Sequence, residues 1–127
     1  MFRIGYTVTT YVAQFVLPVA ALISPKLKDF LHQRKHANLP LKGPVKFWIH
    51  AASLGEYEMA LPLLDKLAPN GNLEDILITI FSPSGYTQAI KGKYASRLMY
   101  LPLDTAANVS QFYHDYAPQK AIFIRYD

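Results

Sequence analysis

Residues 75–81 read DILITIF, an almost unbroken apolar run. A short run without polar alternation is typical of a strand buried on both faces of a parallel sheet. Apolar residues with helical spacing flank it, at residues 55–67 before the run and residues 84–93 after it. A buried strand between two helices is the repeating unit of an α/β fold.

Three further strands and one further helix extend this alternation. Strands are expected at residues 45–50, 98–101 and 120–126, and a helix is expected at residues 105–116. The βαβαβαβ order predicts an open parallel sheet with helices on both faces and right-handed connections. We therefore expect an α/β, Rossmann-like parallel sheet with flanking helices at residues 45–127.

The N-terminus is apolar and carries no charge from Ile4 to Ser24. The run from Ile4 to Ile23 is about long enough to cross a hydrocarbon core as a helix. A signal peptide and a buried amphipathic helix are the alternatives, but the run lacks a polar face and a good cleavage site. We expect a membrane-anchor helix, then a basic helix at residues 25–35 and a linker containing proline and glycine at residues 36–44.

Positive charge gathers directly behind this apolar run. The chain of 127 residues has a formal net charge of +4. Its basic cluster consists of Lys26, Lys28, Arg34, Lys35, Lys42 and Lys46. Basic residues beside an apolar segment favour an anionic membrane surface over nucleic acid, and they place the following domain in the cytoplasm. We therefore assign residues 1–35 to a membrane anchor with its basic juxtamembrane helix.

Composition excludes several kinds of site. The chain has no cysteine, which rules out disulfides, a thiolate nucleophile and cysteine-bound zinc. The four histidines are His32, His36, His50 and His114, and they have no convincing metal-ligand spacing. We therefore expect no metal site.

The turn after the first expected strand carries the strongest chemical signal. Ser53 and Glu56 have the spacing of a capping box, in which each side chain accepts a backbone N–H at a helix start. A carboxylate at the ligand edge of a parallel sheet can also act as a general base. Gly55 allows a substrate to approach the backbone closely, and His50 ends the strand beside this turn. The sequence leaves both interpretations of Glu56 open.

Two later turns place polar residues at expected helix starts. Ser82, Ser84 and Gly85 follow the second strand, where hydroxyl and amide groups at a helix N-terminus can bind an anion. A plain N-cap at Ser82 or Ser84 is the simpler interpretation. Asp104 follows the third strand and is the expected N-cap of the helix at residues 105–116.

Several segments, taken in order, resemble one known family. Residues 48–56 read WIHAASLGE, which resembles the W-x-H-x-x-S-x-G-E signature of the 3-deoxy-D-manno-octulosonic acid (Kdo) transferases. Residues 78–85, ITIFSPSG, resemble the second strand and hydroxyl-rich turn of that family, and residues 100–104, YLPLD, resemble its Y-x-P-x-D segment. The apolar N-terminus also matches, so the resemblance covers nearly the whole chain.

The resemblance implies the N-terminal, acceptor-binding half of a two-domain GT-B glycosyltransferase. It implies that Glu56 is the catalytic base, which deprotonates an acceptor hydroxyl for attack on the Kdo anomeric carbon and release of CMP. It implies no cofactor and no metal. Asp127 stands where the family has a glutamate followed by an aromatic pair. The implied substrate-binding residues are His50, Ser53, Gly55, Ser82, Ser84, Gly85 and Asp127.

The implied partners are a lipid A precursor as acceptor, CMP-Kdo as donor and the cytoplasmic face of the cell inner membrane, with no nucleic acid. The donor would bind a C-terminal domain that is absent from these 127 residues, so we expect the chain alone to be inactive. The alternative is a non-catalytic, membrane-tethered α/β binding module or a degenerate fragment. The intact pair of Ser53 and Glu56 argues against degeneracy.

Overall fold

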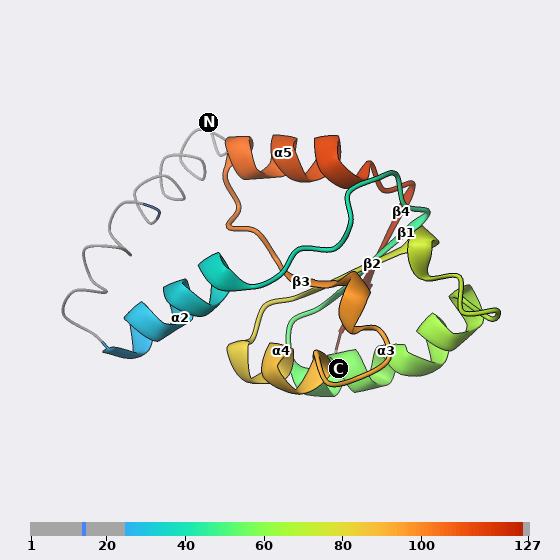
Figure 1. Ribbon diagram of the computed structural model, residues 1–127, viewed down its shortest axis with the longest axis horizontal. Coiled ribbons are helices and arrows are strands. Elements are labelled where there is room, and N and C mark those ends of the chain that lie inside the picture. Colours follow the sequence, from blue (N-terminus) through green and yellow to red (C-terminus); the bar gives the residue numbers. More distant parts are fainter. Residues whose placement is uncertain (1–13, 15–24, 126–127) are drawn as a thin grey trace. The chain divides into compact units, whose positions relative to one another are not determined.

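The computed structural model describes residue 14 and residues 25–125 (Figure 1). The chain divides into two compact units, one with the residues up to 37 and residues 102–112, the other with residues 38–101 and those from 113 onward. No helix in the described part of the chain is long and apolar enough to cross a membrane. The expected anchor at residues 4–23 lies outside the described residues, apart from Gln14.

Helices and strands alternate along the described residues as the sequence predicts. The α-helices are α2 (Pro25–His36), α3 (Leu54–Leu67), α4 (Pro83–Ala89) and α5 (Ala106–Tyr116). The strands are β1 (Phe47–Ala51), β2 (Ile76–Ile80), β3 (Leu98–Tyr100) and β4 (Lys120–Ile124). Single 3-10 turns at Leu73–Asp75 and Ala95–Arg97 lead into β2 and β3.

The strands form one parallel sheet in the order β3-β2-β1-β4. Ile49 of β1 pairs with Ile78 of β2 on one side and with Ile122 of β4 on the other. The chain winds outward from β1 to β3 and then returns to place β4 against β1. The winding direction therefore reverses between β1 and β4. In such sheets, ligands bind in the crevice outside the carboxyl ends of the strands at this reversal.

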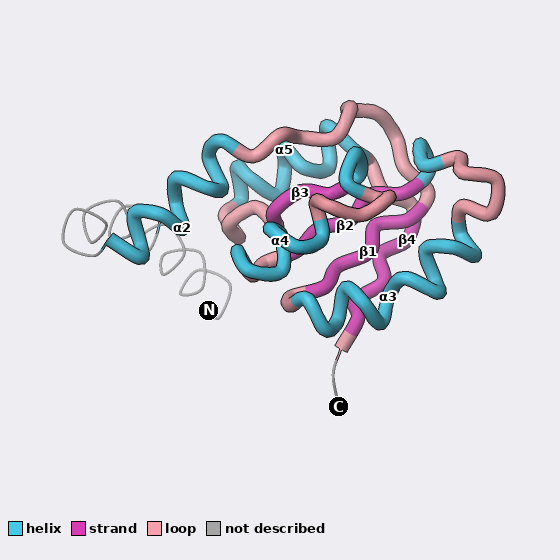
Figure 2. Tube along the Cα trace, turned by 60° about the horizontal axis from the view of Figure 1, so that its bottom comes forward, coloured by secondary structure: helices cyan, strands magenta, loops and turns pink. Residues whose placement is uncertain are grey.

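The centre of the sheet is β2, in which every residue from Ile76 to Ile80 is buried. This burial confirms the predicted strand at Ile76–Ile80, whereas Asp75 belongs to the preceding 3-10 turn and Phe81 is exposed after the strand. Helices α3 and α4 contact each other and cover one face of the sheet, α3 over β1 and β4 and α4 over β3 (Figure 2). Leu64 of α3 is completely buried, and burying such a side chain contributes about 1.5–3 kcal/mol.

The residues just before β1 are held by hydrogen bonds within the second unit. The Tyr116 hydroxyl donates to the Pro40 carbonyl at 3.0 Å, and the Val45 N–H donates to the Tyr116 carbonyl at 2.9 Å. The buried guanidinium of Arg97 donates to the Leu41 carbonyl at 3.4 Å. These contacts fix the path of the chain into β1.

Helix α4 ends at Ala89, before the end at Lys93 that the sequence predicts. The Gly92 N–H donates to the Ala89 carbonyl at 3.0 Å, a three-residue turn in place of the four-residue helical bond. Glycine is a poor helix former because its backbone loses more conformational entropy on folding. Gly92 therefore favours an end of α4 before the predicted end at Lys93.

The N-cap of α5 is Thr105, so the expectation of Asp104 is wrong. Thr105 Oγ1 accepts a hydrogen bond from the Asn108 N–H at 3.2 Å. The Thr105 N–H donates to the Leu103 carbonyl at 2.8 Å. This tight turn places Asp104 one residue before the cap position and leaves it exposed.

The corrected cap makes a stability prediction. We expect Thr105→Ala to lower the free energy of unfolding by about 1 kcal/mol, because an orphan N–H of α5 loses its acceptor. Asp104→Ala is the comparison and should lower the free energy of unfolding by less than Thr105→Ala does. Urea unfolding of the full chain, followed by circular dichroism, measures both. A larger loss of unfolding free energy in Asp104→Ala than in Thr105→Ala would show that Asp104 is the N-cap.

Candidate active site

The turn between β1 and α3 is closed by a capping box. Ser53 Oγ accepts a hydrogen bond from the Glu56 N–H at 3.3 Å, and Glu56 Oε2 accepts one from the Ala52 N–H at 2.6 Å. Ser53 has the extended backbone of an N-cap residue, with φ −132° and ψ 169°. This geometry confirms the cap. It also holds the Glu56 carboxylate at a helix N-terminus, where the helix dipole favours negative charge.

One oxygen of Glu56 remains available for chemistry. The cap uses Oε2, and Oε1 has no hydrogen-bond partner within the described residues. The residue is neither fully buried nor fully exposed. Cap and general base are therefore compatible in a single conformation. Oε2 fixes the carboxylate in place, and Oε1 can accept a proton.

The turn after β2 is bonded directly to the turn after β1. The Ser82 N–H donates to the Ala52 carbonyl at 3.0 Å. Ser82 is the N-cap of α4: its Oγ accepts the Gly85 N–H at 3.2 Å and lies 2.9 Å from Ser84 Oγ. The Gly85 amide serves this cap, and the hydroxyl of Ser84 is exposed to solvent.

Gly85 allows the starts of α3 and α4 to lie close together. The residue is buried, and a Cβ atom added to it would lie 2.9 Å from the Leu54 backbone nitrogen and 2.9 Å from Ile80 Cδ1. The backbone of Leu54 cannot move aside as a flexible side chain can. A residue without Cβ is therefore needed where the two turns meet.

His50 lies near the carboxyl end of β1 and contacts both neighbouring strands. Its Nδ1 lies 2.9 Å from Thr79 Oγ1 on β2, and the same oxygen accepts a hydrogen bond from Trp48 Nε1–H at 2.8 Å. On the other side, Phe123 of β4 packs edge-to-face with His50, with ring centroids 5.7 Å apart, and with Trp48, with centroids 5.3 Å apart.

Burial lowers the pKa of His50 from its ordinary value of 6.5. Desolvation of the ring is the largest cause, while a backbone hydrogen bond at Thr79 and the negative charge of Glu56 both raise the pKa. The lowered pKa makes the imidazole neutral near pH 7. The imidazole is thus close enough to Glu56 to feel the charge of its carboxylate.

Comparisons with known proteins identify the family. The chain matches the sequence model of the family described as 3-Deoxy-D-manno-octulosonic-acid transferase (kdotransferase) over residues 25–127. The chain belongs to the Kdo transferase family. No solved structure matches it.

Two curated relatives agree with this membership. The chain is 29% identical to the 3-deoxy-D-manno-octulosonic acid transferase of Haemophilus influenzae over 130 residues, covering 96% of the chain and 30% of that protein. It is 30% identical to a bifunctional glycosyltransferase/methyltransferase of Fusobacterium nucleatum over 91 residues, covering 68% of the chain and 14% of that protein. The chain thus spans less than a third of the length of either relative.

The Kdo transferase signature at residues 48–56 maps onto β1 and the capping box. His50 ends up beside the turn of Ser53, Gly55 and Glu56, and the turn of Ser82, Ser84 and Gly85 is bonded to it. Asp127 lies outside the described residues. No three residues among His, Cys, Asp and Glu gather into a metal site in the part of the chain that the structure describes.

Three residues around His50 had no role predicted from the sequence: Thr79 and Phe123, which contact its ring, and Trp48, which contacts both of them. Trp48 lies inside the quoted signature, Thr79 is the polar residue of an otherwise apolar strand, and Phe123 lies on β4. The signal that could have found Thr79 is its polarity, since a buried hydroxyl needs hydrogen-bond partners. Phe123 carried no comparable signal, because an aromatic residue is ordinary in a strand.

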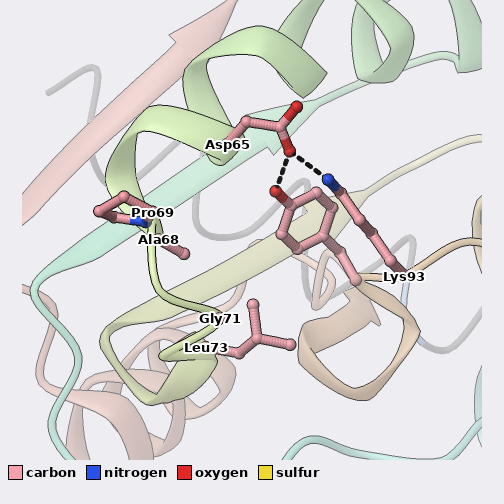
Figure 3. Close-up of a pocket in the computed structure, with 7 residues that line it drawn as sticks. Asp65, Ala68, Pro69, Gly71, Leu73 and Lys93 are labelled. Carbon is pink, nitrogen blue, oxygen red and sulfur yellow. Dashed lines mark hydrogen bonds and ion pairs between the residues drawn. The ribbon is translucent and has the colours of Figure 1, made fainter.

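A pocket of about 330 Å³ lies at the end of α3 far from Glu56 (Figure 3). The Asp65 carboxylate accepts a hydrogen bond from the Tyr94 hydroxyl and pairs with Lys93 Nζ at 2.5 Å. Both contacts lower the pKa of Asp65, with Lys93 the larger cause. The Asp65 carboxylate and the Lys93 ammonium thus neutralise each other, and their ion pair joins α3 to the segment before β3. The lining residues are Asp65, Ala68, Pro69, Gly71, Leu73, Lys93 and Tyr94.

Proposed function

We propose that the chain is the acceptor-binding half of a GT-B glycosyltransferase that moves Kdo from CMP-Kdo to a lipid A precursor. The observation that carries the proposal is the Glu56 carboxylate, fixed through Oε2 at the start of α3 while Oε1 is available. Family membership supplies the reaction class. The turn supplies a base at the edge where α/β sheets bind ligands.

In the proposed reaction, Glu56 accepts the proton of an acceptor hydroxyl. The hydroxyl oxygen forms a bond to the anomeric carbon of Kdo, and the bond between that carbon and the phosphate oxygen of CMP breaks. CMP leaves with the electron pair of the broken bond. Glu56 is protonated at the end of the step and returns the proton to water.

The remaining proposed acceptor contacts surround Glu56. Ser53 and Gly55 belong to the same turn, Ser84 is exposed on the adjacent turn, and His50 is the penultimate residue of β1. The bonded pair of turns makes this a rigid surface, which lowers the entropic cost of orienting a sugar. We include Asp127 because it follows β4, the strand beside β1 at the winding reversal.

The proposed location is the cytoplasmic face of the inner membrane. The apolar run at residues 4–23 is the proposed anchor, and α2 follows it with exposed Lys26, Lys28 and Lys35. Basic side chains directly after an apolar segment are attracted to anionic head groups. The same charges suit the phosphates of a lipid A precursor held at that surface.

A hybrid enzyme tests the proposed function. In this hybrid, residues 1–127 replace the matching segment of the Haemophilus influenzae transferase. With CMP-Kdo and a lipid A precursor, we expect a product heavier by Kdo in mass spectrometry. The parent enzyme is the positive control. A folded hybrid that gives no product beside an active parent would contradict the proposal and favour a non-catalytic binding module.

The 127-residue chain alone makes a separate prediction. We expect it to give no product in the same assay, because the proposed donor-binding half lies outside it. The hybrid, assayed at equal concentration, shows that the substrates and conditions are adequate. Kdo transfer by the purified chain would show that the donor site is already within these residues.

A further inference from the structure

Three side chains of β1 and β2 form a hydrogen-bonded chain on one face of the sheet. The register pairs His50 with Thr79, and Trp48 lies on the same face of β1 as His50 because side chains alternate along a strand. Thr79 Oγ1 accepts from Trp48 Nε1–H at 2.8 Å and lies 2.9 Å from His50 Nδ1. Thr79 is completely buried, whereas Trp48 and His50 are partly exposed.

The number of protons on each side chain decides which groups donate and which accept in these two hydrogen bonds. An indole N–H can only donate, so Thr79 Oγ1 accepts from Trp48. The Thr79 hydroxyl has one proton, and within the described residues its oxygen has two partners, Trp48 and His50. Donation from this hydroxyl to His50 Nδ1 satisfies the buried hydroxyl, while the backbone hydrogen bond at Thr79, which raises the His50 pKa, favours the protonated ring. A proton on Nδ1 directed at the hydroxyl would instead leave a buried O–H without an acceptor, which is costly.

The ring of His50 is also held from the other side. Phe123 packs against it with centroids 5.7 Å apart and ring planes at 73°, the edge-to-face geometry that aromatic pairs prefer. A hydrogen bond from β2 and an aromatic contact from β4 together fix the plane of the imidazole. Nε2, the other ring nitrogen, has no hydrogen-bond partner in the described part of the chain.

We propose that Thr79, oriented by Trp48, is a positioning residue that holds His50 with its proton on Nε2, and that this Nε2–H donates a hydrogen bond to an oxygen of the acceptor sugar. The identity of the ligand rests on the proposed function, whereas the tautomer rests on the contacts alone. A neutral His50 in this tautomer cannot accept a proton at Nε2. Proton removal is therefore left to Glu56, and His50 orients the acceptor.

Nuclear magnetic resonance of the full chain decides the tautomer. The chain is produced with ¹⁵N-labelled histidine and studied well above the ordinary histidine pKa, so that the ring is neutral. His50→Gln identifies the His50 signals among the four histidines. We expect long-range ¹H–¹⁵N spectra to show a protonated Nε2 and an unprotonated Nδ1. A protonated Nδ1, donating to Thr79 and leaving Nε2 as a base, would overturn the proposal.

Two substitutions at Thr79 test its positioning role. Thr79→Val removes the hydroxyl and should shift both ring nitrogens toward the averaged signals of exchanging tautomers. Thr79→Ser keeps the hydroxyl and should restore the wild-type spectrum. Circular dichroism confirms that each variant is folded. An unchanged His50 spectrum in Thr79→Val would overturn the role of Thr79. If this variant does not fold, the wild-type and Thr79→Ser spectra still decide the proton position.

Kinetics of the hybrid enzyme test the ligand. We expect Thr79→Val to raise the acceptor KM about 2-fold, because averaging between tautomers leaves roughly half of the enzyme with a proton on Nε2, with little change in kcat. Thr79→Ser should match the wild type. If Thr79→Val no longer holds the proton of His50 on Nε2 but has an unchanged acceptor KM, the proposed hydrogen bond from Nε2–H to the acceptor is wrong. An inactive wild-type hybrid would contradict the proposed function instead, and the spectra would still decide the tautomer.

Discussion

Glu56→Gln is expected to slow Kdo transfer by the hybrid enzyme about 100-fold or more. Glutamine keeps the size of the side chain and an amide oxygen that can accept the Ala52 N–H, so the cap should lose at most about 1 kcal/mol. The amide cannot take a proton from the acceptor hydroxyl. The measurement is kcat at saturating CMP-Kdo and acceptor, with folding checked by circular dichroism.

Glu58→Gln is the matched control for this result. Glu58 is exposed on the same helix, two residues further along, and removing its charge alters the net charge equally. Residues two apart on a helix do not share a face, so Glu58 should not reach the acceptor. We expect a normal rate. If a folded Glu56→Gln hybrid has nearly normal turnover, Glu56 is not the general base and serves only in the capping box.

Gly85→Ala should lower the free energy of unfolding by about 1–3 kcal/mol, the range for overpacking in a filled core. The added methyl would lie 2.9 Å from the Leu54 backbone nitrogen, so α4 must move away from α3. That movement also strains the hydrogen bond between Ser82 and Ala52, which joins the two turns. Urea unfolding of the full chain measures the loss.

Ser84→Ala is the control within the same turn. Ser84 is exposed, and its substitution should change the free energy of unfolding by less than about 0.5 kcal/mol. Equal stability of Gly85→Ala and the wild type would contradict the close packing of the two helix starts. In the hybrid, Gly85→Ala should also lower the transfer rate, because it displaces the turn that is hydrogen-bonded to Ala52, whose N–H holds Glu56.

Local patterns predicted the elements and one turn. The strand at β2 was predictable because every one of its residues is buried, which leaves an apolar run without alternation. The capping box was predictable because both of its partners lie within four residues of each other. Interactions between residues this close in the sequence can be predicted from their spacing alone.

The cap of α5 was not predictable in the same way. Asp104 and Thr105 are both good N-cap residues, and adjacent candidates differ only in the path of the backbone. The turn closed by the Thr105 N–H and the Leu103 carbonyl decides between them. Residue type indicated that a cap was near, and backbone geometry selected the residue.

The support of His50 needed the sheet register. Trp48 is 31 residues from Thr79, and His50 is 29 residues from it. These side chains meet only because β1 and β2 pair with Trp48 opposite Leu77 and His50 opposite Thr79. A shift by one residue would move Thr79 to the other face of the sheet. The sequence therefore predicted the strands and the polar residues without predicting their contact.

Binding by the 127-residue chain tests directly whether it is the acceptor half. Calorimetry would compare the soluble phosphorylated disaccharide head group of a lipid A precursor with CMP-Kdo. A head group without acyl chains avoids uptake by the apolar N-terminus. We expect the chain to bind the head group, with weaker binding in His50→Gln, and to bind CMP-Kdo little. A chain that bound CMP-Kdo and not the head group would contradict its assignment as the acceptor half.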